Sequence, residues 1–179
     1  MKYLLEGEES QRLLFKKVSN DQFEQWLPFH QDPDSFRYWE GPREEPEAEC
    51  SAWYKKQFWR YENNLGGMNA LIEKQSGLLV GYCGLLVQTV EEKTELEIGY
   101  SLLPQFRNKG FATEAAIKCR DYAFENEFAD SLISIITVNN LPSQHVAIKV
   151  GMKKDFVSIY NNNEVYIYRI WATDLKQRS

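Results

Sequence analysis

The chain has 179 residues, of which 43% are hydrophobic and 26% charged; this composition is typical of a globular domain and excludes a disordered chain. Its formal net charge of −5, without a basic stripe, argues against a nucleic-acid partner. No apolar run approaches the roughly 18 residues of a membrane helix, and the opening MKYLLEGEES has no signal-peptide core, so we predict a cytoplasmic protein without a membrane partner.

The first predicted elements are a strand over 12–18 and a short helix over 21–27. The segment 28–46 is rich in turn formers but also has an aromatic density that is unusual for a connector. A longer helix begins at Pro46, which suits a first-turn position, and Gly66 marks its end. The N-terminal third therefore reads as strand, helix, aromatic loop and helix.

Three strands follow over 68–73, 78–87 and 95–103, joined by the turns KQSG and EEKT, which predicts an antiparallel meander. Beyond a polar loop, the predicted helix over 111–128 carries small residues on one face, so it can lie close to a sheet. The next strand, over 131–138, should run parallel to the strand before the helix, because the helix crosses between them.

A short helix over 142–150 and a final hairpin that turns at 161–163 complete the predicted elements. The fold class is α/β: a mixed, mainly antiparallel sheet with a central β-α-β crossover and flanking helices. No linker divides the sequence, so we predict one domain over 1–179 with its core over about 12–171.

Cysteine and histidine are sparse, which limits the site chemistries. Cys50, Cys83 and Cys119 have no CxxC spacing and an odd count, so we expect buried, reduced, non-catalytic thiols. Only His30 and His145 are available as imidazole bases, and no Cys/His cluster has zinc spacing. We therefore predict no bound metal.

The stretch EIGYSLLPQFRNKGFATEA leads from a strand through a basic loop, closed by Gly110, into a helix. Unpaired backbone N–H groups and the positive end of the helix dipole make such a junction an anion site, and a glycine lets a phosphate approach closely. The Walker and Rossmann patterns are absent. A basic turn that simply ends in a glycine remains the alternative.

The residues RNKGFA at 107–112 resemble the Gln/Arg-x-x-Gly-x-Gly/Ala signature of the GNAT superfamily of N-acetyltransferases. LEIGYSLLPQFRNKGFATEA as a whole is similar to the branch that contains ribosomal-protein N-terminal acetyltransferases (Rim-type), and NNLPSQHVAIKVGM resembles another segment of that branch. The order of elements also follows this family, so the resemblance covers nearly the whole chain.

The resemblance implies acetyl-coenzyme A as co-substrate, with no metal. Its pyrophosphate would bind the loop made of Arg107, Asn108, Lys109, Gly110, Phe111 and Ala112. Its pantetheine arm would run beside the strand near Leu102 and Leu103. Asn140 would contact the pantetheine, and Ser143 would approach the sulfur end.

Three residues are candidates for catalysis of direct amine attack on the thioester, which requires a neutral amine and a way to handle the departing thiolate. Glu97 matches the family's acidic position and would accept the amine proton, although a structural carboxylate is the alternative. Ser143 would donate to the thiolate or else cap the helix that begins near Pro142. Tyr100 is a weaker candidate for the acid. Outside this set, Glu114 is expected to steady the loop or the sheet rather than to act in catalysis, and Arg169 to bind substrate or form a structural ion pair.

The acceptor is where the sequence says least. Tyr38, Trp39 and Glu40 are candidate substrate contacts, because the family closes this region over its acceptor. The same region is rich in glutamates, namely Glu40, Glu44, Glu45, Glu47 and Glu49. Their negative charge would attract a cationic acceptor, or else it would only favour the start of the next helix through the helix dipole.

The resemblance thus predicts an acetyl-CoA-dependent N-acetyltransferase that acts on a primary amine, either a peptide N-terminus or a small molecule. An antibiotic- or polyamine-modifying enzyme and a catalytically silent acyl-CoA-binding domain are the alternatives. The sequence leaves open whether the protein is a monomer or a homodimer.

Overall fold

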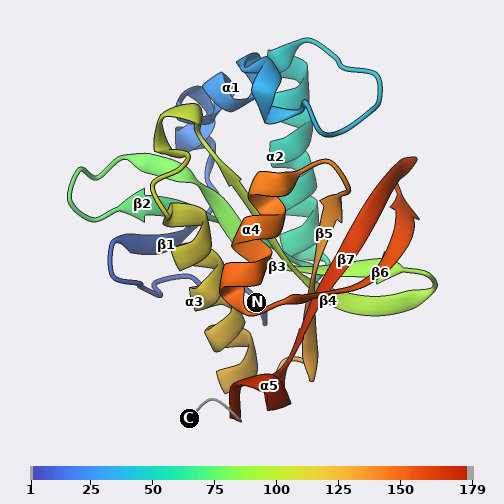
Figure 1. Cartoon of the computed structure of the whole chain (residues 1–179). Helices are drawn as coiled ribbons and strands as arrows, with labels where there is room; N and C mark the ends of the chain where they lie inside the picture. Colours follow the sequence, from blue (N-terminus) through green and yellow to red (C-terminus); the bar gives the residue numbers. More distant parts are fainter. Residues whose placement is uncertain (1, 177–179) are drawn as a thin grey trace.

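The computed structural model describes residues 2–176 and contains a seven-stranded sheet flanked by helices (Figure 1). The strand order is β1-β2-β3-β4-β5-β7-β6, and only the β4–β5 pair is parallel. The strands are β1 (Leu13–Lys17), β2 (Gly66–Glu73), β3 (Leu79–Val90), β4 (Lys93–Leu102), β5 (Ser131–Thr137), β6 (Lys153–Tyr160) and β7 (Asn163–Trp171). The predicted mixed sheet with its central crossover is confirmed.

The helices lie on both faces of this sheet. They are α1 (Phe23–Gln31), α2 (Pro46–Glu62), α3 (Phe111–Glu125), α4 (Leu141–Val150) and α5 (Ala172–Lys176), with 3-10 turns η1 (Asn20–Gln22), η2 (Pro33–Ser35) and η3 (Pro104–Phe106). Tyr82 of β3 contacts Tyr54 of α2, with 2.7 Å between the hydroxyl oxygens, whereas its neighbour Cys83 contacts Cys119 of α3, with 3.6 Å between the sulfurs. Because neighbours on a strand point to opposite faces, α2 and α3 cover opposite faces, as Figure 1 also shows.

Helix α3 packs closely on the sheet because its inner face carries small side chains. Ala115, Ala116, Cys119 and Ala123 are fully buried, as the spacing predicted. All three cysteines are buried free thiols. Burial raises the pKa of Cys50 to about 11 and that of Cys119 well above its ordinary value, so both remain protonated thiols at neutral pH.

Helix α1 is longer than predicted and runs through Pro28 to Gln31. A proline removes one backbone donor and usually ends a helix, which is why the prediction ended at residue 27. Tertiary packing outweighs this cost here, because Trp26 and Phe29 stack with ring centroids 4.2 Å apart inside an aromatic cluster that also includes Tyr82. Helix α5 was not predicted at all.

The sheet opens between its two parallel strands. Strands β4 and β5 share one registered pair, Glu97 with Ile133. Next to it, the Ser134 hydroxyl donates to the carbonyl of Ile98 at 2.9 Å, and the strands then diverge toward the C-terminal end of β4. The opening leads directly to the loop before α3.

Within residues 2–176, no helix is long and apolar enough to span a bilayer.

Candidate active site

The loop between η3 and α3 presents a row of free backbone donors. Asn108 and Gly110 both have left-handed backbones, with φ of 60° and 83°. Within the described chain, the amides of residues 108–113 donate to no protein acceptor, and the first helical bond runs from the Glu114 amide to the Gly110 carbonyl. The Arg107 amide, expected among the free donors, donates instead to the Pro104 carbonyl at 3.3 Å. Free amides at a helix N-terminus are donors ready for an anion.

A second group of contacts fixes this loop against the start of the sheet. The Glu114 carboxylate accepts from the Arg12 backbone amide and from Arg12 Nε, both at 2.7 Å, and Arg12 Nη1 donates to the carbonyl of Lys109 at 3.0 Å. The Arg12 guanidinium also lies 4.1 Å from the centroid of the Phe111 ring. The expectation that Glu114 steadies the loop is confirmed.

The space beside the loop suits a phosphate-bearing ligand. A groove of about 530 Å³ follows the exposed side of α3, and Gly110, Thr113, Lys118 and Lys149 are among its lining residues. A Cβ on Gly110 would meet only the tip of Arg12, at 3.4 Å, so the protein itself leaves this position open. Free amides at a helix N-terminus fit a diphosphate, and Lys149 adds positive charge beside them, whereas Lys118 is paired with Glu8 at 2.7 Å.

On the α3–α4 face, the structure brings together the start of α4 and the end of β4. The Tyr100 hydroxyl donates to the backbone carbonyl of Ser143 at 2.8 Å. The cap of α4 is Asn140, whose side-chain oxygen accepts from the Ser143 amide at 3.1 Å, and the helix begins at Leu141. The alternative that Ser143 caps this helix is therefore wrong. Its hydroxyl bonds to no group among the described residues.

The opposite face carries Glu97, because positions 97 and 100 point to opposite sides of β4. Gln88 Nε2 donates to Glu97 Oε2 at 2.7 Å, and the Tyr160 hydroxyl donates to Gln88 Oε1 at 3.3 Å. Burial raises the pKa of Glu97 above its ordinary value, whereas Gln88 and nearby Arg60 oppose that shift. A carboxylate with a raised pKa is suited to accept a proton near neutral pH.

The Arg60 side chain lies beneath this face and is almost fully buried. One guanidinium nitrogen donates to the carbonyls of Leu65 and Val87, both at 2.7 Å. Burial lowers the pKa of Arg60, although Glu97 opposes the shift. The arginine thus supplies positive charge beneath Glu97 while it joins α2 to β3.

The candidate acceptor residues form a wall above this face. Trp39 lies against Tyr160, with ring centroids 6.5 Å apart. The Glu40 backbone exchanges hydrogen bonds with the Asn163 side chain, at 2.7 and 3.1 Å. The aromatic loop is therefore fixed to the β6–β7 hairpin near Gln88, although Trp39 and Glu40 come from the distant N-terminal third. Tyr38 differs, since its hydroxyl bonds to Arg37.

Arg169 is committed to structural contacts. It pairs with Glu95 at 2.9 Å and Asp155 at 2.7 Å, and it donates to the Ser131 hydroxyl at 2.8 Å. Of the two roles open to it from the sequence, the structure supports the ion pair. Its guanidinium joins β4 and β5 on the side of Glu97 away from the opening.

Sequence reasoning missed Gln88, Tyr160 and Asn163, which surround Glu97 and the acceptor wall. Each lies in or next to a strand whose local pattern indicates only a strand or a turn. No local signal distinguishes them, because their role comes from contacts across 9 to 123 positions of sequence.

The family follows from a domain comparison that agrees with this geometry. Residues 12–153 match the model of the acetyltransferase (GNAT) domain, which is a class of acyl-group transferases. The chain therefore belongs to the GNAT acetyltransferase family. An uncharacterized Bacillus subtilis protein, YkkB, is 32% identical over 124 residues, which cover 68% of this chain and 69% of that protein.

Solved structures share the fold across nearly the whole chain. An acetyltransferase from Agrobacterium tumefaciens aligns with a TM-score of 0.76 and 21% identity over 91% of this chain and 92% of that one. A ribosomal-protein-S5-alanine acetyltransferase from Vibrio fischeri aligns with a TM-score of 0.71 and 16% identity over 93% of this chain and 97% of that one. Spermidine N-acetyltransferase from Vibrio cholerae, in complex with CoA and spermine, aligns with a TM-score of 0.71 and 17% identity over 90% of this chain and 96% of that one.

Proposed function

We propose that the protein transfers the acetyl group of acetyl-CoA to a primary amine. The observation that carries this proposal is the opening between β4 and β5, which has the free-amide loop at one end and Glu97 at its closed end. An extended ligand held by the loop would reach Glu97 through this opening. The CoA in the related spermidine acetyltransferase supports the choice of ligand.

Different residues would bind the pyrophosphate and the pantetheine arm of the ligand. The amides of residues 108–113 would hold its pyrophosphate at the N-terminus of α3, and the strand end at Leu102 and Leu103 would lie beside its pantetheine arm. Asn140 would lie next to that arm at the start of α4. Bound acetyl-CoA supplies a thioester, which is an activated acyl donor.

The reaction then needs two proton transfers. As the amine nitrogen bonds to the carbonyl carbon and the carbon–sulfur bond breaks, Glu97 accepts the amine proton, directly or through water. The thiolate takes a proton or a hydrogen bond from the opposite face of β4. Ser143 is favoured over Tyr100 there, because the Tyr100 proton is already donated to the Ser143 carbonyl.

The acceptor class that the site favours is a cationic amine. Glu40 of the acceptor wall is exposed, as are Glu44, Glu45 and Glu47 in the segment that follows it, whereas Glu49 is paired with Arg43. An exposed acidic rim raises the local concentration of cations, and salt screens this effect. Spermidine acetylation by a protein of the same fold supports this choice.

A panel of amines tests the proposal. Polyamines, aminoglycosides, peptides with basic or acidic N-termini and neutral amines would each be incubated with acetyl-CoA, and release of free thiol would be measured. We expect turnover with at least one cationic amine and a kcat/KM that falls as salt is raised. A protein that binds CoA but releases thiol with no amine is the silent binding domain, and this outcome contradicts the proposal.

Binding of CoA alone should stabilise the protein. A ligand at about 100 times its dissociation constant adds roughly 2.7 kcal/mol to the free energy of unfolding. For a chain of this size that corresponds to a rise in Tm of about 5–10 °C. Differential scanning fluorimetry measures it, with adenosine as the control that lacks the pyrophosphate. An unchanged Tm at millimolar CoA would contradict the assignment of the loop.

Replacement of Gln88 should move the pH dependence of the reaction. Gln88 donates to Glu97 and so favours the ionised carboxylate. In Gln88→Leu that support is lost, the pKa of Glu97 rises further, and the acidic limb of kcat/KM shifts to higher pH. Tyr160→Phe, which removes only the hydroxyl bonded to Gln88, should give a smaller shift in the same direction. Superimposable pH profiles of wild type and Gln88→Leu would exclude Glu97 as the base.

A further inference from the structure

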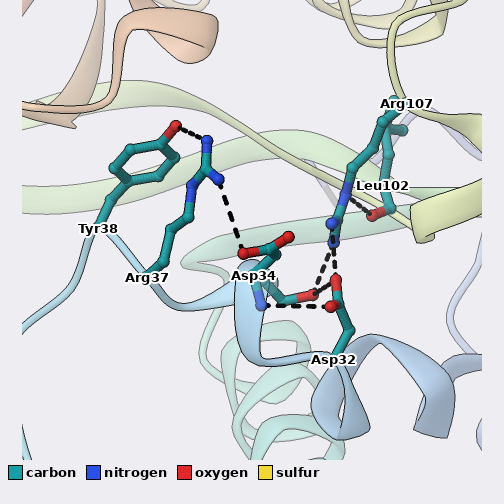
Figure 2. A network of polar contacts seen from close by, with 7 residues as sticks. Asp32, Asp34, Arg37, Tyr38, Leu102 and Arg107 are labelled. Atoms are coloured by element: carbon teal, nitrogen blue, oxygen red, sulfur yellow. Dashed lines mark hydrogen bonds and ion pairs between the residues drawn. The ribbon is translucent and has the colours of Figure 1, made fainter.

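The side chain of Arg107 does not serve the anion loop in which its backbone lies. Nη1 donates to Asp32 Oδ2 at 2.7 Å, Nη2 to the Ser35 hydroxyl at 2.6 Å, and Nε to the Leu102 carbonyl at 3.3 Å. Figure 2 shows the guanidinium directed away from its own loop and toward the end of α1. The guanidinium therefore bridges two segments that are 72 to 75 positions apart in sequence.

The receiving end of this bridge is the turn η2. Asp32 is its N-cap: one carboxylate oxygen accepts from the Asp34 amide at 3.2 Å, and the other accepts from the Ser35 hydroxyl at 3.1 Å. Burial would raise the pKa of Asp32, but Arg107 and these donors hold it below its ordinary value. The carboxylate is thus ionised and joins the turn and the arginine in one rigid unit.

The polar contacts continue from η2 into the acceptor wall. Asp34 pairs with Arg37 at 3.6 Å, and Arg37 in turn bonds to the Tyr38 hydroxyl (Figure 2). Trp39 and Glu40 follow, with Glu40 fixed to the β6–β7 hairpin. Within residues 2–176, the hydrogen bonds between segment 32–40 and loop 107–112 all pass through the Arg107 guanidinium.

We propose that Arg107 is a positioning residue that couples occupancy of the anion loop to the placement of segment 32–40, which carries Trp39 and Glu40 of the acceptor wall. The inference rests on the proposed function, because it takes CoA as the ligand of the loop. A planar guanidinium that bonds two side chains of one turn, Asp32 and Ser35, fixes the orientation of that turn, so a loop ordered by ligand also orders η2. By linkage, an acceptor on the wall would strengthen CoA binding by the same factor.

Hydrogen exchange with CoA alone as the probe tests this coupling without an acceptor. In the wild type, CoA should slow amide exchange in the loop, residues 108–113, and also in segment 33–40, by roughly 5-fold or more, the lower end of typical couplings. In Asp32→Asn, which keeps the shape of the side chain, and in Arg107→Gln, slowing of the loop should remain. Slowing of segment 33–40 should fall below about 2-fold in both variants.

Two further variants and one kinetic measurement sharpen the test. Arg37→Gln leaves the bridge intact but breaks the contacts beyond η2, so CoA should still slow exchange in residues 33–36 and should slow it less in residues 38–40. The double variant Arg107→Gln/Asp32→Asn should lose no more coupling than either single variant, because both act on one contact. With the best amine of the panel, KM for the amine should rise in Asp32→Asn while the Kd for CoA changes little.

The outcomes separate this inference from the proposed function. If CoA protects the loop but leaves segment 33–40 unchanged in the wild type, or protects it equally in both bridge variants, the coupling is overturned and CoA binding stands. If CoA slows exchange nowhere in the wild type, the proposed function fails, and the coupling fails with it.

Discussion

Glu97→Gln should lower kcat by about 10²- to 10⁴-fold at neutral pH, the range typical of a lost general base. The amide keeps the size of the side chain but cannot accept the amine proton. The Kd for CoA should hardly change, since the loop amides lie beyond the open end of the β4–β5 gap. Part of the loss should be recovered at higher pH, because more of the amine is then neutral. Steady-state kinetics between pH 6 and 9, together with calorimetry of CoA binding, measure both effects.

Stability provides the matched control for this variant. Burial raises the native pKa of Glu97 above its unfolded value, so the wild type loses stability as pH rises through that range. Glu97→Gln has no such penalty and should be at least as stable as the wild type at pH 8, with a smaller advantage near pH 4. Wild-type turnover across the pH range would identify Glu97 as a structural carboxylate. A large fall in Tm at pH 8 would argue for the same conclusion.

Gly110→Val should weaken CoA binding by at least about 10-fold, and by about 100-fold if two amide contacts to the phosphates are lost, because each hydrogen bond to a charged group contributes roughly 1.5–3 kcal/mol. The new side chain would enter space that the protein leaves open beside the loop amides. The positive φ of 83° adds a strain of about 1–2 kcal/mol to the folded state. Titration calorimetry with CoA measures the affinity.

Gly77 offers a control with the same backbone and a different location. Its φ is 70°, and a Cβ there would meet nothing within 4 Å, yet it lies in the turn before β3. Gly77→Val should therefore lower Tm about as much as Gly110→Val and leave the affinity for CoA unchanged. Equal affinities for CoA in the wild type and both variants would show that the loop does not bind CoA and is only a basic turn that ends in a glycine.

The sequence by itself determined the order of elements up to the final hairpin, the antiparallel meander, the close approach of α3 to the sheet and the position of the loop whose amides are free before α3. These features are local. Strand alternation, turn residues and helical spacing repeat within a few residues, and the free amides before α3 follow from the strand-to-helix junction at Gly110. The family resemblance was likewise carried by short motifs, of which the longest surrounds the same glycine, and the domain match confirms it.

Only the tertiary structure decided which side chains meet. The path of α1 through Pro28 depends on an aromatic cluster that joins α1 to Tyr82 of β3. The partners of Glu97, the ion pairs of Arg169 and the direction of Arg107 depend on segments that are distant in the chain. Local backbone geometry is set by neighbouring residues, but the environment of a side chain is set by whatever the folded chain packs against it. The loop could therefore be found from the sequence, whereas the link from the loop to the acceptor wall required the fold.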